Sequence, residues 1–512
     1  MTVVGLWHVL KRYGCLTTLH GPDALQFLEG KRLALDFSFD LVNQLTLQGG
    51  SSEINTHDMA RKLVFERVVW LLRHGAQVIG CGDGIPPAEK AHTLTQRFAS
   101  RSHGAHGGGR ANQAFLRLTR EVETTLAMLG CPSIVGETLA EGEARAAALC
   151  HLGFADAVIS PDSDALIHGS PVVIKRVDVG SDARKAELEF VSLATVRARL
   201  GFGAEGLLAL ALLLGNDMWE GAAGAGVVHA TDLVRFLVTR AGGGAEGEAK
   251  ALEEVITLGE SALSEEESSA LEHTHCKGFC KVCGHAHRGK QHGRRGCVEC
   301  GVVSGCTPTD EGALVGTEQC PCPFHRTRML RLLARTRKRA HGDAAWTTAS
   351  ARHCRDAFHS LREHALRDVE AKAKLQNLNA WWHEGRRPAC TSSALDLLAA
   401  LRPSADSKGV SDTVAYRLRP LALEWDMRVV SQRPEWQGGE LSNTSASALR
   451  GCDAHYHPLR YKSNANGFVS VEYRALKGPS EGAAEDTLIC QLRRSLIERF
   501  APALPQEIQS CP

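Results

Sequence analysis

The sequence has few aromatic residues and no long apolar run, and each shortage excludes a class of protein. Phe, Trp and Tyr make up 5% of the 512 residues, whereas the hydrophobic fraction is 43%, which is ample for globular cores. The longest apolar run, Leu207–Leu214, is far shorter than the ~20 residues that span a bilayer. The first residues lack the basic and apolar regions of a secretory signal. We therefore expect a soluble, intracellular protein with no membrane partner.

The chain also has almost no net charge, since 59 basic and 58 acidic residues leave +1. The charges are nevertheless segregated, because acids concentrate in the first half and Arg, Lys and His crowd residues 276–341. Such asymmetry indicates an anionic partner, although a solvated basic face would give the same pattern. The length predicts two to four domains.

Short apolar segments alternate with helical patterns in the first part of the chain. The expected strands are 32–37, 76–81, 133–135 and 156–160, and the expected helices are 60–72, 111–129 and 141–152. This alternation predicts an α/β fold with a doubly wound, mainly parallel sheet. Residues 191–240 predict helices with a glycine-rich turn, and near the C-terminus 467–473 predicts a strand and 487–500 a helix.

Acidic residues stand where the apolar strands end or where the next helix begins. They are Asp36, Asp83, Glu141, Glu143, Asp162, Asp164 and Asp217. Ligand sites in open parallel sheets lie beyond the carboxyl ends of the strands. An acid cluster is costly unless cations neutralise it, and carboxylate oxygens suit Mg²⁺ or Mn²⁺. Each acid alone is typical of a helix cap or a solvated loop, but together they predict a metal-dependent phosphoryl enzyme.

Five ordered segments at these acids resemble the motifs of the flap endonuclease and XPG superfamily of structure-selective 5′ nucleases. They are 5–7 with 28–38, 83–90, 141–144, 162–166 and 212–217, and they fall within roughly the first 240 residues. The resemblance implies a PIN-like nuclease core in which the seven acids hold two Mg²⁺ ions, with Mn²⁺ as a substitute. It also implies that Lys90 and Arg97 face the scissile phosphate. Thr2 departs from the family, which has Gly there.

The glycine-rich segment 221–226 resembles the helix–two-turn–helix element of the same superfamily. In that element backbone carbonyls hold K⁺ against a DNA phosphate, so the resemblance implies K⁺ and a DNA-binding role for Gly224 and Gly226. The segment lacks the usual Pro of the family. A flexible glycine turn between helices is the alternative.

Eight of the 17 cysteines fall between Cys276 and Cys322. In a chain without an export signal, that density indicates metal binding rather than disulfides. Two Cys-x₂-Cys pairs thirteen residues apart have the spacing of a zinc ribbon, and they are formed by Cys280, Cys283, Cys297 and Cys300. A second site would use Cys306, Cys320, Cys322 and His325. We expect one or two structural Zn²⁺ ions, and free thiols are the alternative.

Residues 296–300 and 320–327 resemble the segment that follows the nuclease core in GEN-type Holliday junction resolvases. That resemblance implies a nuclear enzyme of recombination and repair that cuts Holliday junctions and 5′ flaps, as a monomer when free and a dimer on the junction. Basic residues in 326–339, among them Arg335, Arg337 and Lys338, would hold a DNA arm through its phosphates. The alternatives are a flap or bubble nuclease of the same superfamily and a non-catalytic junction-binding protein.

The expected domains follow from these motifs. They are a nuclease core over 1–240, a cysteine-rich zinc module over 270–330, a helical region over 331–450 and a small α+β module over 455–510. The last module resembles a chromodomain loosely, and a generic small β/α module is the alternative.

Overall fold

The structure, a computed structural model, describes a large part of the chain. The described residues are 3–38, 64, 67–72, 74–85, 90, 108–136, 138–178, 186–222, 226–273, 323–343, 346–378, 455–463, 468–476 and 486–493. They fall into two compact units. We call residues 1–13 with 196–356 the helical unit, and residues 14–195 with 357–512 the sheet unit. The expected nuclease core over 1–240 is thus divided between the two.

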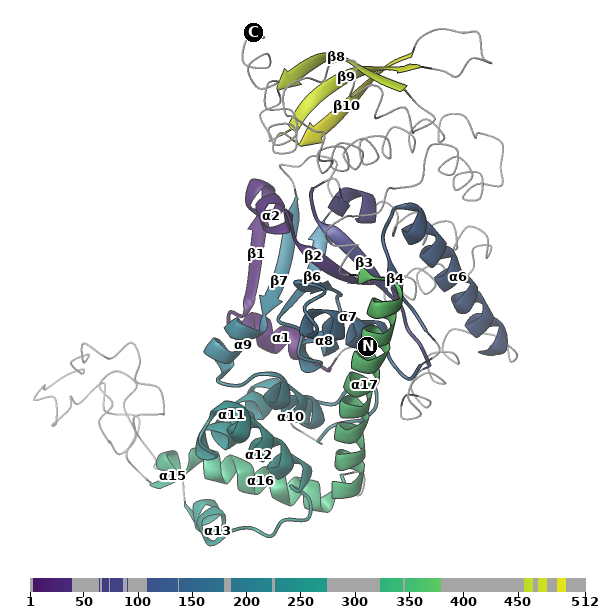
Figure 1. Cartoon of the computed structure of the whole chain (residues 1–512). Helices are drawn as coiled ribbons and strands as arrows, with labels where there is room; N and C mark the ends of the chain where they lie inside the picture. The colour runs from purple at the N-terminus through teal and green to yellow at the C-terminus, as the bar shows by residue number, and fades with distance from the viewer. Residues whose placement is uncertain are drawn as a thin grey trace, which may run out of the picture. The chain divides into compact units, whose positions relative to one another are not determined.

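A seven-stranded sheet forms the centre of the sheet unit (Figure 1). In the order of the sheet its strands are β1 (Leu16–His20), β7 (Glu187–Ser192), β6 (Val172–Asp178), β5 (Ala157–Ile159), β2 (Arg32–Asp36), β3 (Gln77–Cys81) and β4 (Ser133–Ile134). The five strands from β6 to β4 are parallel, and β7 runs antiparallel to both of its neighbours. This arrangement confirms the predicted fold class.

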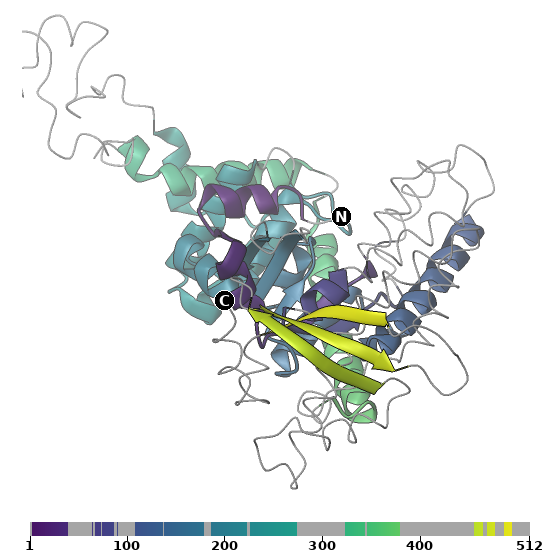
Figure 2. The same ribbon diagram turned by 90° about the horizontal axis from the view of Figure 1, so that it is seen from above.

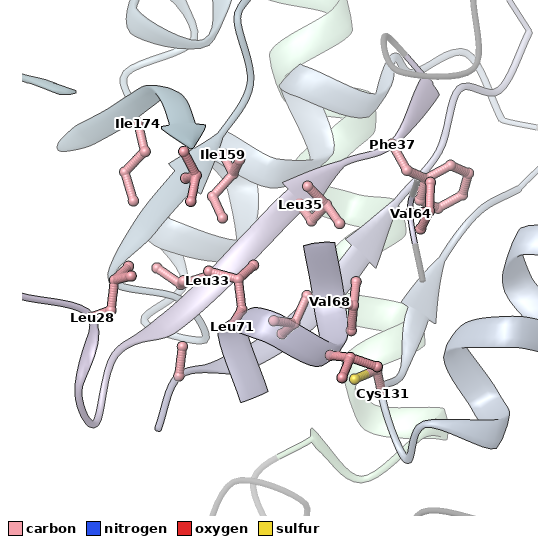
Figure 3. Close-up of a cluster of buried hydrophobic side chains, with 14 of the residues drawn as sticks. Leu28, Leu33, Leu35, Phe37, Val64, Val68, Leu71, Cys131, Ile159 and Ile174 are labelled. Carbon is pink, nitrogen blue, oxygen red and sulfur yellow. The ribbon is translucent and has the colours of Figure 1, made fainter. Parts of the chain in front are cut away.

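The central strands are apolar along their length because both faces of the sheet are covered. One face packs against α2 (Gly21–Leu28), the helical residues 67–72 and α6 (Gly108–Met128), which lies beside β4 (Figures 1 and 2). Figure 3 shows Leu33 and Leu35 of β2 in this core together with Leu28, Val68 and Ile159. The helix α7 (Gly142–His151) contacts β2, β3 and β5.

Two further helices complete the surroundings of α7. The short helix α8 (Asp164–Ile167) contacts α7, and the long helix α17 (Thr348–Leu375) belongs to the sheet unit from Ala357 onward. In α17 the buried side chains Phe358, Leu361, Ala365 and Val369 recur every three or four residues, which is the spacing of one helical face. Residues 142–149 of α7 are all buried, and several are Ala, which lets neighbouring elements approach closely.

A second sheet near the C-terminus has three antiparallel strands, drawn in yellow in Figure 2. They are β8 (His455–Ser463), β9 (Phe468–Leu476) and β10 (Asp486–Arg493). The predicted strand at 467–473 is confirmed within β9. The predicted helix over 487–500 is wrong for residues 487–493, which pair with β9 instead. The β-branched residues Thr487 and Ile489 favour an extended backbone, and the β9 ladder satisfies its hydrogen bonds.

The helical unit is built from α1 (Leu6–Arg12), most of α9 (Leu193–Leu200), α10 (Ala204–Leu214), α11 (Val227–Arg240), α12 (Gly244–Ile256), α13 (Glu265–Glu272), α15 (Pro323–Arg326), α16 (Arg328–Gly342) and the start of α17. The apolar helix α10 is buried from residue 206 to 213 and contacts α11 and α12. None of the described helices has the length and hydropathy that a membrane span requires.

Candidate metal centre

Three carboxylates from three elements meet at the carboxyl edge of the parallel strands. Asp36 is the last residue of β2, Asp83 follows β3, and Glu143 lies in the first turn of α7. One carboxylate oxygen from each lies within 4.8 Å of the other two. Asp36 and Glu143 are buried. Closely spaced, buried carboxylate oxygens are the donor set that hard divalent cations prefer, so these residues fit such an ion.

The orientation of Asp36 is fixed by two serines. The hydroxyl of Ser160 donates to Asp36 Oδ2 at 2.9 Å, and the backbone N–H of Ser38 donates to Asp36 Oδ1 at 3.2 Å. The Ser38 hydroxyl also accepts a hydrogen bond from the backbone N–H of Asp83 at 2.7 Å. The ends of β2 and β3 are therefore tied together directly beside the acids, and outer partners of this kind fix a ligand's orientation.

Glu143 reaches the other acids because α7 begins with a residue that has no side chain. The backbone N–H of Gly142 donates to Asp83 Oδ1 at 2.8 Å. A Cβ atom at this position would lie only 2.6 Å from Asp36 Oδ1 and 3.2 Å from Asp83 Oδ1. The role of Gly142 was not predicted from the sequence, although its place between Glu141 and Glu143 is a usable signal.

Asp162 and Asp164 extend the acid cluster from the end of β5. Ser160, which donates to Asp36, also accepts the backbone N–H of Asp162 at 3.1 Å. The Asp162 carboxylate in turn accepts the backbone N–H of Asp164 at 3.0 Å. Both acids and Ser160 are buried. Ser160 thus links the acids of two neighbouring strands, a role that sequence reasoning did not identify.

Glu141 forms an ion pair with Lys90. Lys90 Nζ lies 2.6 Å from Glu141 Oε1 and 2.7 Å from Oε2, and both side chains are largely buried. Lys90 therefore lies beside the acids, and its contact with the scissile phosphate stays a prediction. Arg97 lies outside the described residues.

Burial and the neighbouring acids both disfavour the charged form of Glu143. Its pKa is raised well above the ordinary value, first because burial removes water from the carboxylate and then because Glu141, Asp162 and Asp36 are close. Lys90 opposes this shift. A divalent ion bound at the cluster would offset the same repulsion.

The seventh acid, Asp217, belongs to the helical unit, so its place among the ligands stays a prediction. It is buried and follows α10, where the neighbouring Asn216 side chain accepts the backbone N–H of Met218 at 2.9 Å. The expected helix–two-turn–helix element over 221–226 stays a prediction; of that segment, Gly226 is the N-cap of α11. Gly224 lies outside the described residues.

The expected DNA-contacting cations of α16 differ in their surroundings. Arg335 and Lys338 are exposed. Arg337 is buried, and its guanidinium donates to Glu254 at 2.7 Å and to Glu267 at 3.2 Å. In this arrangement Arg337 holds α16 against α12 and α13, and the DNA contacts of Arg335 and Lys338 stay predictions.

The expected zinc ligands fall almost entirely outside the described residues. The exception is His325, which lies in α15. Both zinc sites therefore stay predictions from the spacing of the cysteines.

Comparisons with known proteins agree with this geometry. Residues 133–217, which include α7 and α8, match the XPG I-region. The chain is 26% identical over 308 residues to Flap endonuclease GEN homolog 1 of Mus musculus, covering 59% of this chain and 31% of the relative. It is 29% identical over 331 residues to Flap endonuclease GEN-like 1 of Arabidopsis thaliana, covering 62% of this chain and 52% of the relative. The chain thus spans about a third of the first relative's length and about half of the second's.

A solved structure shares the fold at lower identity. Human GEN1 in complex with Holliday junction DNA superposes with a TM-score of 0.53 at 15% identity, and the match covers 99% of this chain and 97% of the other. That likeness concerns the fold. In sequence, the chain is similar to the XPG I-region over residues 133–217 and to GEN-type flap endonucleases over about three fifths of its length.

Proposed function

We propose that this protein is a divalent-metal-dependent endodeoxyribonuclease that cuts branched DNA, namely Holliday junctions and 5′ flaps, in nuclear recombination and repair. The observation that carries the proposal is the meeting of Asp36, Asp83 and Glu143 at one edge of the sheet. A purely binding protein would gain nothing from acids at this density beside a polyanion, because each repels phosphate. The GEN-type relatives support the choice of branched DNA.

Six acids of the sheet unit would hold two Mg²⁺ ions, with Mn²⁺ as a substitute, and Asp217 would complete the set. The six are Asp36, Asp83, Glu141, Glu143, Asp162 and Asp164. Bound ions would supply an activated water and would stabilise the leaving oxygen of the phosphodiester. The chain itself orients the carboxylates through Ser38, Ser160 and the N–H of Gly142.

Lys90 would bind the DNA substrate through a phosphate. Glu141 holds the Lys90 ammonium at the cluster, where it would donate to a phosphate oxygen of the DNA. Exposed Arg335 and Lys338 would add phosphate contacts along a duplex arm. We further propose K⁺ at the turn before α11, in the region of Gly224 and Gly226, as a bridge to the DNA backbone.

The decisive experiment incubates the full chain with labelled four-way junctions and 5′ flaps, with Mg²⁺ and with EDTA. Asp36→Asn should abolish incision and retain junction binding, because it removes a carboxylate of the cluster and lowers repulsion of phosphate. The matched control is Asp23→Asn, which changes an exposed acid at the start of α2. Full activity of Asp36→Asn, or activity in excess EDTA, would refute the proposal.

The same assay separates the alternatives. Incision of flaps without incision of junctions would favour a flap nuclease of the same superfamily. Tight binding of junctions with no incision in Mg²⁺ or Mn²⁺ would favour a non-catalytic binding protein.

We also propose that the cysteine-rich segment folds around one or two structural Zn²⁺ ions. The support is the double Cys-x₂-Cys spacing of Cys280, Cys283, Cys297 and Cys300, with Cys306, Cys320, Cys322 and His325 as the second set. Elemental analysis should find one or two zinc equivalents, and Cys283→Ser with Cys300→Ser should lower that number. A zinc-free protein with unchanged melting would contradict this part of the proposal.

A further inference from the structure

The edge strand β4 is covered by side chains from the end of α17, which lies beside it in Figure 1. The carbonyls of Pro132 and Ile134 accept hydrogen bonds from the N–H groups of Gly80 in β3 and of Gly82 just after it, so the alternate carbonyls of Ser133 and Val135 face away from the sheet. Gln376 Nε2 donates to the Ser133 carbonyl at 3.0 Å, and Lys372 Nζ donates to that of Val135. Two donors one helical turn apart thus satisfy the free edge next to the acid cluster.

One turn earlier on α17, Asp368 forms a buried ion pair with Arg145 of α7. Arg145 Nε donates to Asp368 Oδ2 at 2.8 Å, and the side chain of Arg145 is fully buried. The remaining guanidinium nitrogens donate to Thr138 Oγ1 at 2.8 Å, to the Gly136 carbonyl at 3.3 Å and to the Gly82 carbonyl. The guanidinium therefore joins α7, α17 and the two segments that leave β3 and β4.

Two of these connections reach metal-centre acids. Arg145 follows Glu143 by two residues on α7, and Gly82 directly precedes Asp83. The loop is packed so closely on the guanidinium that a Cβ atom at Gly84 would lie 2.8 Å from Arg145 Nη2. A single side chain thus sets the spacing between the segment that carries Asp83 and the helix that carries Glu143.

We propose that Arg145 and Asp368 are positioning residues of the metal centre, and that α17 is part of the nuclease although Asp368 follows Arg145 by 223 residues in the chain. The inference rests on the proposed function. Asp368 neutralises a guanidinium that is buried and cannot lose its proton, so removing the carboxylate would leave the cation uncompensated. Arg145 would then be drawn toward other acceptors, and the Gly82–Asp83 loop and α7 would shift relative to each other.

The test measures Mn²⁺ binding to the full chain by electron paramagnetic resonance, without DNA, alongside thermal melting. Asp368→Asn should weaken Mn²⁺ binding roughly tenfold or more, the range found when outer partners of metal ligands are removed. Asp368→Glu keeps the charge and should restore most of the affinity. A purely structural ion pair would lower the melting temperature and leave the Mn²⁺ affinity of the folded protein unchanged.

The matched control is Asp156→Asn. Asp156 forms an ion pair with Arg32 at 2.7 Å at the opposite end of β2 from Asp36. The Asp156→Asn variant should have a lower melting temperature but an unchanged affinity for Mn²⁺. Arg145→Lys provides a second variant if Asp368→Asn does not fold, because Lys keeps the charge but lacks the fork that reaches Gly82, Thr138 and Asp368 together. It should weaken Mn²⁺ binding with a smaller loss of melting temperature.

The outcomes separate this inference from the function on which it rests. Normal Mn²⁺ affinity in folded Asp368→Asn or Arg145→Lys, or an equal loss in Asp156→Asn, would overturn the positioning role alone. Failure of the unsubstituted protein to bind Mn²⁺ would overturn the proposed function together with the positioning role.

Discussion

The backbone N–H of Gly142 donates to Asp83 Oδ1 at 2.8 Å, and a Cβ atom on Gly142 would lie 2.6 Å from Asp36 Oδ1. The first turn of α7 therefore rests directly on two acids that end neighbouring strands. In a mainly parallel sheet the helix after each strand returns across the sheet, and here its N-terminus is directed back at the strand ends. Partial positive charge at a helix N-terminus stabilises carboxylates placed there.

Gly142→Ala should therefore damage the metal centre. The new methyl group cannot coexist with the present position of Asp36, so the carboxylate must move by several tenths of an ångström or α7 must retreat from Asp83. We expect a loss of incision rate of roughly 100-fold, as small misplacements in an active site can cause, and weaker Mn²⁺ binding. Gly342→Ala is the matched control, because a Cβ atom there meets nothing within 4 Å. Equal activity of the two variants would refute the close-packing argument.

Glu143 makes the stability of the metal-free protein depend on pH. Its pKa is raised above the ordinary value of 4.5 by burial and by Glu141, Asp162 and Asp36. The folded state therefore holds the proton more tightly than the unfolded state, so its stability falls as the pH rises above 4.5 toward the raised pKa. In EDTA the melting temperature should decline over this window, and Mg²⁺ should raise it more at higher pH, because the ion competes with the proton.

Glu143→Gln provides the comparison. The amide cannot ionise, so the decline of melting temperature with pH in EDTA should be smaller than in the unsubstituted protein. The benefit of Mg²⁺ should shrink as well, since a ligand is lost. Identical pH profiles with and without the substitution would mean that Glu143 does not carry the repulsion.

Much of the fold could be predicted from the sequence because the parallel strands are covered on both faces. The runs that became β2, β3 and β5 are almost wholly apolar, and such runs between helical patterns indicate a parallel sheet. Strands β1, β6 and β7 were not predicted. They lie on the far side of the sheet from β4, and several of their residues are partly or fully exposed, which removes the continuous apolar signal.

The acids of the site were predictable, but the groups that position them were not. Asp36, Asp83 and Asp162 mark strand ends, and their convergence follows from parallel strands sharing one edge. No sequence pattern distinguishes Ser160 or Arg145, because a serine after a strand and an arginine in an alanine-rich helix are common. Their roles depend on partners far away in sequence, Asp36 for Ser160 and Asp368 for Arg145.

The basic side chains of α16 should fall into two groups, one that stabilises the fold and one that contacts DNA phosphates. Arg337→Met removes a buried guanidinium from Glu254 and Glu267 and should cost ~3–5 kcal/mol of unfolding free energy, as breaking buried pairs does. Arg335→Ala with Lys338→Ala removes exposed charges and should leave the melting temperature nearly unchanged. The double variant should instead lower the slope of log affinity against log salt by about 2, roughly one for each lost phosphate contact. An unchanged slope would exclude these residues from the DNA contact.

A four-way junction is two-fold symmetric, and one active site can cut one strand at a time. Two copies of the chain related by that symmetry would place two metal centres on the DNA without a dimer interface in solution. The resemblance to GEN-type resolvases motivates this pairing. We therefore expect a monomer in solution and a two-to-one complex on the junction.

Cleavage of a supercoiled cruciform plasmid tests the pairing directly. Coordinated cuts within one complex give linear DNA, whereas independent cuts release the supercoiling and destroy the cruciform after the first nick. We expect mostly linear product at saturating protein. Mixing in an excess of inactive Asp36→Asn should convert the product to nicked circles, because mixed pairs contain one working centre. Mostly nicked circles with the unsubstituted protein alone would instead favour a flap nuclease that acts as a single copy.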